Sequence, residues 1–342
     1  MTWNDLSRCR RELMGAACLW ILMGHNLFRW SEPWINVKRF FSWGNCGVDL
    51  FLLLSGIGLY FAYHGREGEL GRFYRRRFVR LLVPYLLLHG PYYIWYCLRN
   101  HENFLLYLSQ AALPLRGVQT SWYIAASAVF YLLFPLIYHL QKEIPARTGR
   151  LSRPTVTLLL CMISLAVCRL LMTAAPVFYE RTEILLTRLP VFLMGCDLGE
   201  AVMEKRGIPR TAVWAGIAFV WLLIYQFYPE NGMPTFWIRM VMIPLALGMI
   251  LGLTALLRCL GERNWFRVFL RFFGDHSIEI YLTHMVFLKL WWAYLSERPI
   301  LENLIPDYLM ILAVSIAVSA AVHPLIGGIS HSLLKNAEGG EK

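Results

Sequence analysis

Long apolar runs of 18 to 23 residues recur along the chain and are separated by short polar segments. None of them alternates strictly between apolar and polar residues as a membrane-spanning strand does, so each run predicts a helix. A helix needs about 20 residues to cross the hydrocarbon core of a bilayer. The pattern therefore predicts an all-α, polytopic membrane protein with about ten transmembrane helices: 13–30, 46–64, 79–98, 119–140, 155–176, 183–201, 211–228, 235–257, 277–295 and 306–326.

The composition excludes an ordinary soluble domain. Hydrophobic residues make up 57% of the 342 residues, charged residues make up 16%, and the mean hydropathy is +0.47. Soluble domains have roughly 45–50% apolar and about 25% charged residues. We expect a single membrane domain over residues 1–330 and a short cytoplasmic tail over residues 331–342. Segment 102–113 predicts a short amphipathic helix on the outer surface.

The positive charge is distributed unevenly between the two sides of the predicted membrane. The formal net charge is +11, and 22 Lys and Arg residues fall on the side of the N-terminus against 8 on the other side. The positive-inside rule therefore predicts that both termini are cytoplasmic. Because orientation accounts for most of this charge, no nucleic-acid partner is expected. The eight Cys residues show no metal-ligand spacing, so we expect no metal site and no disulfide framework.

One predicted layer toward the outer leaflet collects six polar or aromatic residues from five spans: His25, Asp49, Trp122, Tyr123, Arg188 and Arg239. A charged side chain at the bilayer centre costs about 2.5–3.5 kcal/mol on insertion scales, so it needs a partner or a water-filled cavity. His25 and Asp49 lie at matching depths on neighbouring spans, which predicts a histidine/carboxylate pair suited to general-base catalysis. The alternative for the layer is interfacial snorkelling and an aromatic belt.

Two further groups of polar residues lie toward the cytoplasmic side. Arginines cluster at the inner end of span 79–98, and arginine suits bidentate contact with phosphate: Arg72, Arg75, Arg76, Arg77 and Arg80. The alternative for this cluster is contact with anionic lipid.

In span 277–295, Glu279 and His284 are five residues apart and lie on different helix faces. His284 either lines a path from the inner face or hydrogen-bonds a neighbouring helix.

Pairs of glycines four residues apart predict close helix packing at Gly195/Gly199 and Gly248/Gly252.

The chain as a whole resembles the acyltransferase family 3 membrane proteins, ten-helix enzymes that acylate cell-surface sugars. The resemblance extends over essentially the whole chain and rests on six stretches in the family's order: RELMGAACLWILMGHN, GVDLFLLLSGIGLYF, FYRRRFVRLLVPY, SWYIAASAVFYLLFPLIY, TRLPVFLMGCDLG and HSIEIYLTHMVFL.

This resemblance implies an integral membrane O-acyltransferase that takes an acyl group, most simply acetyl, from cytoplasmic acyl-CoA to a hydroxyl of an extracytoplasmic glycan or glycolipid. His25 falls on the family's first-span histidine, the catalytic base, and Asp49 and Ser55-Gly56 fall on its second-span motif. The donor-binding residues would be Arg11, Arg75, Arg76, Arg77 and Arg80. The acceptor or oxyanion residues would be Trp122, Tyr123 and Arg188, and the pathway residues would be Glu279 and His284.

Two departures from the family pattern concern the donor side. Met14 stands where many members have Arg, with Arg10 and Arg11 about one turn nearer the cytosol. Ser127 or Ala128 stands where a Glu often follows the Trp of the fourth span. A diverged subgroup that positions the donor differently would account for both departures, and altered activity is the alternative.

The expected location is the plasma membrane, which in a bacterium is the inner membrane, with membrane lipid as a partner and no permanently bound cofactor.

A different functional class is a multi-pass transporter or flippase with a proton-coupled polar path. Such proteins carry repeats with interrupted helices in corresponding halves. The chain shows no convincing repeat, since the prolines within its spans fall at unmatched places: Pro84, Pro135, Pro190 and Pro244.

Overall fold

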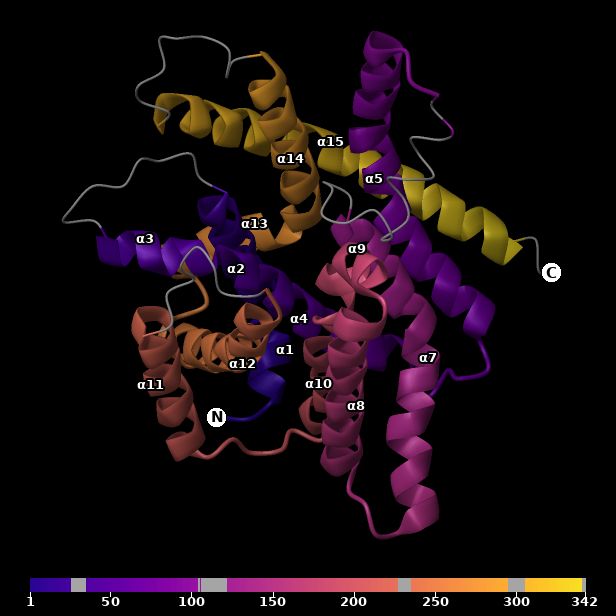
Figure 1. The fold of residues 1–342 in the computed structure, drawn as a ribbon, viewed down its shortest axis with the longest axis vertical. Coiled ribbons are helices and arrows are strands. Elements are labelled where there is room, and N and C mark those ends of the chain that lie inside the picture. Colours follow the sequence, from indigo (N-terminus) through magenta and orange to yellow (C-terminus); the bar gives the residue numbers. More distant parts are fainter. Residues whose placement is uncertain (26–34, 104, 106–121, 227–234, 295–304, 340–342) are drawn as a thin grey trace.

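The computed structural model describes residues 1–25, 35–103, 105, 122–226, 235–294 and 305–339. Within these ranges the chain forms helices and no strand, apart from an isolated bridge between Thr2 and Gly207. The elements shown in Figure 1 are α1 (Asn4–Arg8), α2 (Arg10–Gly24), α3 (Ile35–Ser42), η1 (Trp43–Asn45), α4 (Cys46–Tyr63), α5 (Leu70–Asn100), α7 (Trp122–Thr148), α8 (Arg153–Ala174), α9 (Pro176–Leu186), α10 (Leu189–Met203), α11 (Arg210–Gln226), α12 (Thr235–Cys259), α13 (Trp265–Asp275), α14 (Ser277–Tyr294) and α15 (Ile305–Gly339).

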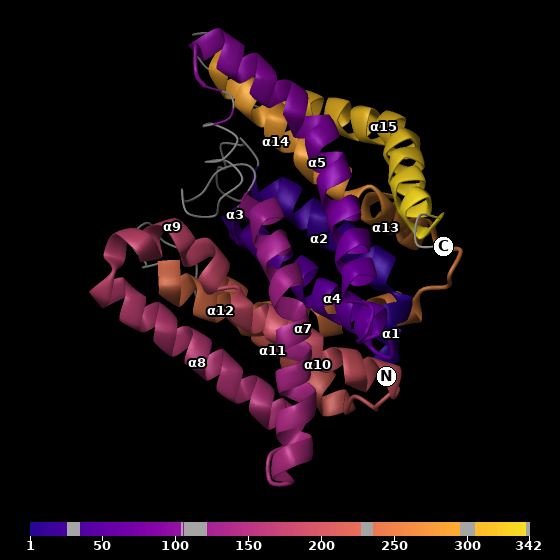
Figure 2. The same ribbon diagram turned by 90° about the vertical axis from the view of Figure 1, so that its right-hand side faces the viewer.

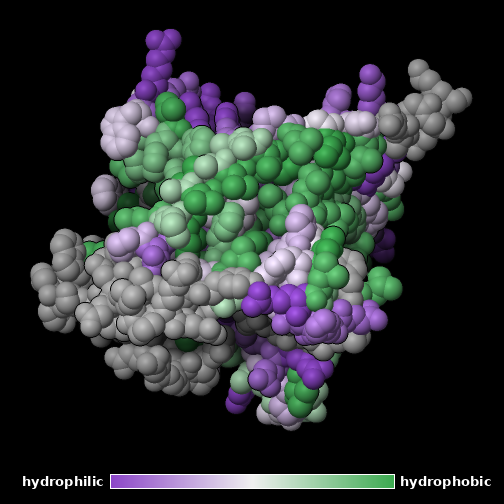
Figure 3. Space-filling model, turned by 90° about the horizontal axis from the view of Figure 1, so that it is seen from above, coloured by the Kyte–Doolittle hydropathy of each residue, from purple (hydrophilic) through white to green (hydrophobic). Residues whose placement is uncertain are grey.

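Five helical stretches of the described chain are long and apolar enough to cross a membrane: Val37–Tyr63, Trp122–Thr148, Arg153–Ala174, Phe236–Cys259 and Pro306–Lys335. Figure 3 shows a broad hydrophobic face with hydrophilic residues along its upper edge, as expected for a surface in contact with lipid. The all-helical membrane class is therefore confirmed. The count of ten spans and the cytoplasmic termini stay predictions. Segments 26–30, 119–121, 227–228 and 295 of the predicted spans, and most of segment 102–113, lie outside the described residues.

Predicted span 183–201 is divided between two helices in the structure. α9 ends at Leu186 and α10 begins at Leu189, so that Arg188 immediately precedes α10. Pro190 lies in the first turn of α10, where backbone N–H groups have no hydrogen-bond partner within the helix, so the missing N–H of proline breaks no hydrogen bond. If α9 and α10 were one continuous helix, Pro190 would lie in its interior and would remove a hydrogen bond. The apolar pattern alone does not reveal this break, because both helices are apolar.

Two other helices extend beyond the predicted apolar runs. α5 begins at Leu70, so the arginine cluster lies on the helix itself. α15 continues to Gly339, which makes residues 331–339 of the predicted tail helical. Figure 2 shows α5 running alongside α14, and these two helices pack against each other.

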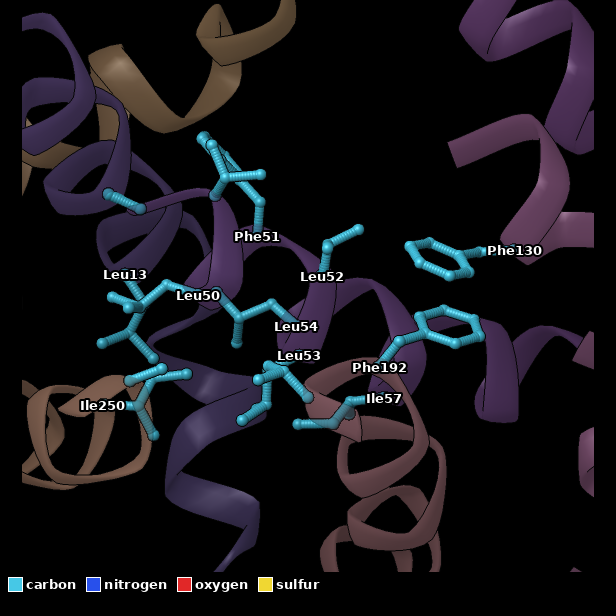
Figure 4. Close-up of a cluster of buried hydrophobic side chains, with 14 of the residues drawn as sticks. Leu13, Leu50, Phe51, Leu52, Leu53, Leu54, Ile57, Phe130, Phe192 and Ile250 are labelled. Atoms are coloured by element: carbon cyan, nitrogen blue, oxygen red, sulfur yellow. The ribbon is translucent and has the colours of Figure 1, made fainter. Parts of the chain in front are cut away.

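α4 lies at the centre of the fold and packs against α2, α7, α10 and α12. Its sequence is apolar on all sides, which is typical of a helix buried within a bundle. Figure 4 shows the α4 side chains among residues of these four neighbours: Leu13, Phe130, Phe192 and Ile250. The rings of Phe130 and Phe192 stack with their centroids 4.7 Å apart.

Close helix packing occurs at both predicted glycine pairs. A Cβ atom at each of these glycines would meet the neighbouring helix: Gly195 at Leu53, Gly199 at Tyr60, Gly248 at Gly216 and Gly252 at Ile217. The first pair allows α10 to approach α4, and the second allows α12 to approach α11. The packing role predicted for both pairs is therefore confirmed.

α13 is a short helix that lies outside the predicted apolar spans. It packs against α2 through a buried ion cluster, in which Glu12 accepts hydrogen bonds from Arg267 at 2.7 Å and from Arg271 at 2.8 Å. Glu12 is 1% exposed, so it depends on both cations for compensation. Arg11 and Asp275 add a second, more exposed ion pair between the two helices.

The backbones of α2 and α13 are in direct contact at two glycines. A Cβ atom at Gly15 would overlap the carbonyl oxygen of Leu270, and one at Gly274 would overlap that of Arg11. Neither oxygen can move aside without disturbing its helix. The position of α2 therefore depends on these two residues having no side chain.

We predict that Gly15→Ala forces α2 and α13 apart and lowers the thermal unfolding midpoint of the detergent-solubilised protein. Overpacking of this kind typically costs about 1–3 kcal/mol. Gly327→Ala is the matched control, because it lies in α15 where a Cβ atom would meet nothing within 4 Å. The control should unfold at the parent temperature or above it, since Ala favours helix over Gly. Equal midpoints for the two variants would contradict the packing argument.

Candidate active site

Two neighbouring cavities are walled by residues from α2, α4, α7 and α14, and they have three lining residues in common: Ile21, Val48 and Tyr281. The first, here termed the arginine cavity, has a volume of about 340 Å³, and its basic lining residues are Arg10, Arg77 and Arg80. The second, termed the histidine cavity, has a volume of about 440 Å³ and is lined by His25, Trp122 and Lys289, among others. A wall of three shared side chains therefore stands between a basic cavity and one that contains an imidazole.

The arginine cavity carries positive charge that the described residues do not neutralise. In the described chain, none of its three arginines forms an ion pair, and the Nε atom of Arg10 is buried without a hydrogen-bond partner. Burial lowers the pKa of Arg10, and it lowers the pKa of Arg77 to about 10, so the Arg77 side chain stays charged at neutral pH. An anion such as a phosphate would supply the missing charge and hydrogen-bond acceptors.

The residues predicted to bind the donor separate into two groups. Arg77 and Arg80 line the arginine cavity, whereas Arg75 and Arg76 lie on the same helix but are not among its lining residues. The predicted role of Arg11 stays untested, and its side chain pairs with Asp275, which does line the cavity.

Arg10 also lines the arginine cavity, and the sequence prediction did not include it among the donor residues. Met14, where the resemblance predicts an arginine, lines the cavity one helical turn further along α2. The signal that could have identified Arg10 is this four-residue spacing, which places Arg10 and Met14 on one helix face. Arg10 therefore brings a guanidinium to the cavity that Met14 lacks.

His25 and His284 form a hydrogen-bonded pair in the described structure. The Nδ1 atom of His25 lies 3.0 Å from Nε2 of His284, and Nδ1 of His284 lies 3.0 Å from the carbonyl oxygen of Ile280. His25 caps the C-terminal end of α2, and His284 is completely buried in α14. Two helices far apart in the sequence therefore bring these imidazoles together.

The backbone carbonyl of Ile280 determines where the protons of this pair lie. A carbonyl oxygen only accepts, so Nδ1 of His284 donates to it, and Nε2 of a neutral His284 is left as an acceptor. Nδ1 of His25 must then donate to that Nε2 atom. In neutral His25 the remaining nitrogen, Nε2, therefore carries a free lone pair, as a general base requires.

The predicted contact between His25 and Asp49 is wrong in this structure. Asp49 is 2% exposed, and its Oδ1 atom lies 3.6 Å from Nε of Arg188, whereas His25 is hydrogen-bonded to His284. Arg188 is a fully buried cation, and the nearest carboxylate on α4 pairs with it because an unpaired charge is costly there. The imidazole of His25 takes a neutral partner instead.

Arg188 lies behind the wall of the histidine cavity. Its guanidinium donates a 2.8 Å hydrogen bond to Oδ1 of Asn45 and a 3.2 Å hydrogen bond to the carbonyl oxygen of Ile184, and it lies 4.7 Å from the ring centre of Trp122. Asn45, Ile184 and Trp122 all line the cavity, but Arg188 is not among the lining residues. Its contacts therefore fit a positioning residue that holds three parts of the wall together.

The remaining predicted site residues, Trp122, Tyr123 and Glu279, do not share one cavity. Trp122 lines the histidine cavity, whereas its neighbour Tyr123 lines the arginine cavity and packs against Tyr281 with the ring centroids 5.3 Å apart. Glu279 is separate from His284, because it faces α15 and accepts a 2.9 Å hydrogen bond from Nδ1 of His323. Among the described residues, no group of three His, Cys, Asp or Glu side chains could hold a metal ion.

The chain matches the model of one known protein family. The acyltransferase 3 model, described as an acyltransferase domain, matches residues 15–323, which is nearly the whole chain. The chain belongs to the acyltransferase 3 family. No curated protein and no solved structure matches it. The match confirms the expected family and with it a membrane acyltransferase. The matched residues include His25, His284 and all residues that line the two cavities except Arg10 and Met14.

We predict that Asp49→Asn destabilises this acyltransferase by about 3–5 kcal/mol, because it leaves the Arg188 cation buried without its counter-charge. Unfolding by SDS in mixed micelles would measure the change. The double variant Asp49→Asn with Arg188→Met should lose less than the sum of the single changes. Glu143→Gln is the control, because its partner Arg147 is 79% exposed and such pairs contribute about 0–1 kcal/mol. Additive losses would contradict the pairing.

Proposed function

We propose that this acyltransferase is an integral membrane O-acetyltransferase that uses acetyl-CoA. The donor binds at the arginine cavity from the cytoplasm, and the acceptor is a hydroxyl of an extracytoplasmic glycan or glycolipid in the histidine cavity. The observation that carries the proposal is the pair of adjacent cavities, one basic and one with an imidazole, separated by three shared residues. The proposed location is the plasma membrane, the inner membrane if the source is bacterial.

α2 supports this arrangement because it contributes to both cavities. Arg10 at its first residue and His25 just after its last are 15 positions apart, or about 22 Å at the helical rise. A coenzyme A whose phosphates contact Arg10, Arg77 and Arg80 would direct its extended pantetheine arm along this helix. The thioester would then reach the wall of Ile21, Val48 and Tyr281, where the acceptor hydroxyl can meet it.

In the proposed reaction, His25 acts as general base and then as general acid. Its Nε2 atom takes the proton of the acceptor hydroxyl as the hydroxyl oxygen bonds to the thioester carbonyl carbon. When the tetrahedral intermediate collapses, the carbon–sulfur bond breaks, and the departing thiolate takes the proton from the His25 imidazolium. The products are the O-acetyl ester and free coenzyme A, with no net change in protons.

The proposal assigns the oxyanion contact to Tyr281 and gives Arg188 a positioning role. Tyr281 lines both cavities and packs against Tyr123 and His284, at ring-centroid distances of 5.3 Å and 5.6 Å. A hydroxyl donor in the shared wall can stabilise the charge that develops on the carbonyl oxygen. Asp49 contributes through Arg188, whose contacts with Asn45 and Trp122 keep the wall in place.

We predict that His25→Ala lowers transfer of radiolabelled acetyl groups by about 100-fold to 10,000-fold, the usual contribution of a general base. His284→Ala should also lower kcat, because Nδ1 of His25 then lacks its acceptor and the proton can occupy either nitrogen. His284→Gln keeps an accepting oxygen and should restore part of the rate. Undiminished transfer by His25→Ala would contradict the base role, and equal rates for the two His284 variants would contradict the positioning role.

We predict that replacing Arg77 and Arg80 by Ala raises the KM for acetyl-CoA by about tenfold or more for each arginine removed, since each charge-assisted hydrogen bond contributes about 1.5–3 kcal/mol. Stabilisation of the protein against heat by acetyl-CoA should be lost in parallel. Arg72→Ala is the matched control, because Arg72 lies on the same helix, pairs with Glu69, and is not a lining residue of the arginine cavity. A parent protein that acetyl-CoA does not stabilise would contradict the donor site and favour a transport function.

A further inference from the structure

Lys289 lies in the histidine cavity with His25, and the proposed reaction gives it no role. Among the described lining residues it is the single formally charged side chain. Its Nζ atom lies 5.7 Å from the ring centre of Tyr92, and no carboxylate of the described chain lies within 4.0 Å of it. An aromatic face therefore supports the ammonium group, and the described residues supply no counter-ion.

Two buried cations near this cavity, Arg188 and Arg239, have carboxylate partners. Arg188 pairs with Asp49 at 3.6 Å, and Arg239 pairs with Glu183 at 3.7 Å. Each of these pairs is internally neutral, whereas Lys289 has no such partner among the described residues. A cation in a membrane protein needs a partner or water, and a half-buried ammonium that faces a substrate cavity is suited to an anionic substrate group.

The position of Lys289 along α14 indicates which part of the acceptor it would contact. Tyr281, Met285 and Lys289 all line the cavity at four-residue spacing, so they lie on one face of the helix. Lys289 is eight residues from Tyr281, or about 12 Å along the helix axis. Because Tyr281 belongs to the shared wall, Lys289 would contact a part of the acceptor that is remote from the reacting hydroxyl.

We infer that the acceptor carries an anionic group, a carboxylate or a phosphate, and that Lys289 binds it. The inference rests on the proposed function, because it takes the histidine cavity to be the acceptor site. Lys289 is then a specificity-determining residue that contributes to acceptor affinity and does not take part in proton transfer. Acidic glycosides and phosphorylated glycosides are the two sources of such an anion.

The test compares glycosides that differ in charge and have similar rings. Purified protein in detergent would be heated with methyl glucuronide, with glucose 6-phosphate, or with uncharged methyl glucoside, at equal ionic strength. The anionic probes should stabilise the parent more than methyl glucoside does, and the difference should disappear in Lys289→Met and persist in Lys289→Arg. Whether methyl glucuronide or glucose 6-phosphate has the larger effect distinguishes carboxylate from phosphate. Loss of the charge should weaken binding by about tenfold.

Arg99→Met is the matched control, since Arg99 also lies over an aromatic ring, 5.9 Å from that of Trp95, but does not line the histidine cavity. Its preference for the anionic probes should equal that of the parent. Equal stabilisation by charged and uncharged probes, no stabilisation by any probe, or an unchanged preference in Lys289→Met would each overturn the inference and leave Lys289 as a snorkelling lysine.

A separate readout distinguishes this inference from the proposed function. Transfer of radiolabelled acetyl groups to the same probes is measured for the parent and for His25→Ala. If the anionic probes bind through Lys289 but receive no acetyl group in a His25-dependent manner, the proposed function fails while the anion site stands. If acetyl transfer depends on His25 but shows no preference for the anionic probes and no change in Lys289→Met, the anion site fails while the function stands.

Discussion

The placement of α2 between α4 and α13 is the constraint on which both cavities depend. On one side, a Cβ atom at Gly47 of α4 would lie 2.6 Å from the carbonyl oxygen of Ala17, and on the other, Gly15 touches the backbone of Leu270. The helix therefore has little freedom to shift or rotate. Arg10 and His25 project from its two ends into different cavities, so the same backbone contacts fix the distance between the proposed donor and acceptor sites.

Charge compensation explains which polar residues form the scaffold and which face a cavity. Glu12 with Arg267 and Arg271, and Asp49 with Arg188, are buried clusters whose members have partners within the protein. They connect helices that are distant in the sequence, and removing one member leaves an expensive buried charge. By contrast, Arg10, Arg77 and Lys289 have no carboxylate partner in the part of the chain that the structure describes, and all three line a cavity.

The sequence predicted the helical membrane class and the family, because apolar run length and local motifs carry those features directly. It also placed His25, Trp122 and Arg188 near one level. It did not predict α13, whose apolar positions occur only on one face, or the helix break at Arg188, which depends on Pro190. The partner of His25 was also missed. Depth along separate spans cannot show how each helix is rotated, and rotation directs Asp49 toward Arg188 and His284 toward His25.

The choice of a second histidine as the partner of His25 has a consequence for the proposed chemistry. A carboxylate partner would stabilise the imidazolium strongly in a low-dielectric site, because the attraction between opposite charges grows as the dielectric constant falls. His284 offers a neutral acceptor whose own proton is held by the carbonyl of Ile280. It fixes the tautomer of His25 without adding a negative charge. The imidazolium formed during attack is then less stabilised, so it returns its proton readily to the departing thiolate, and the transfer finishes with His25 neutral again.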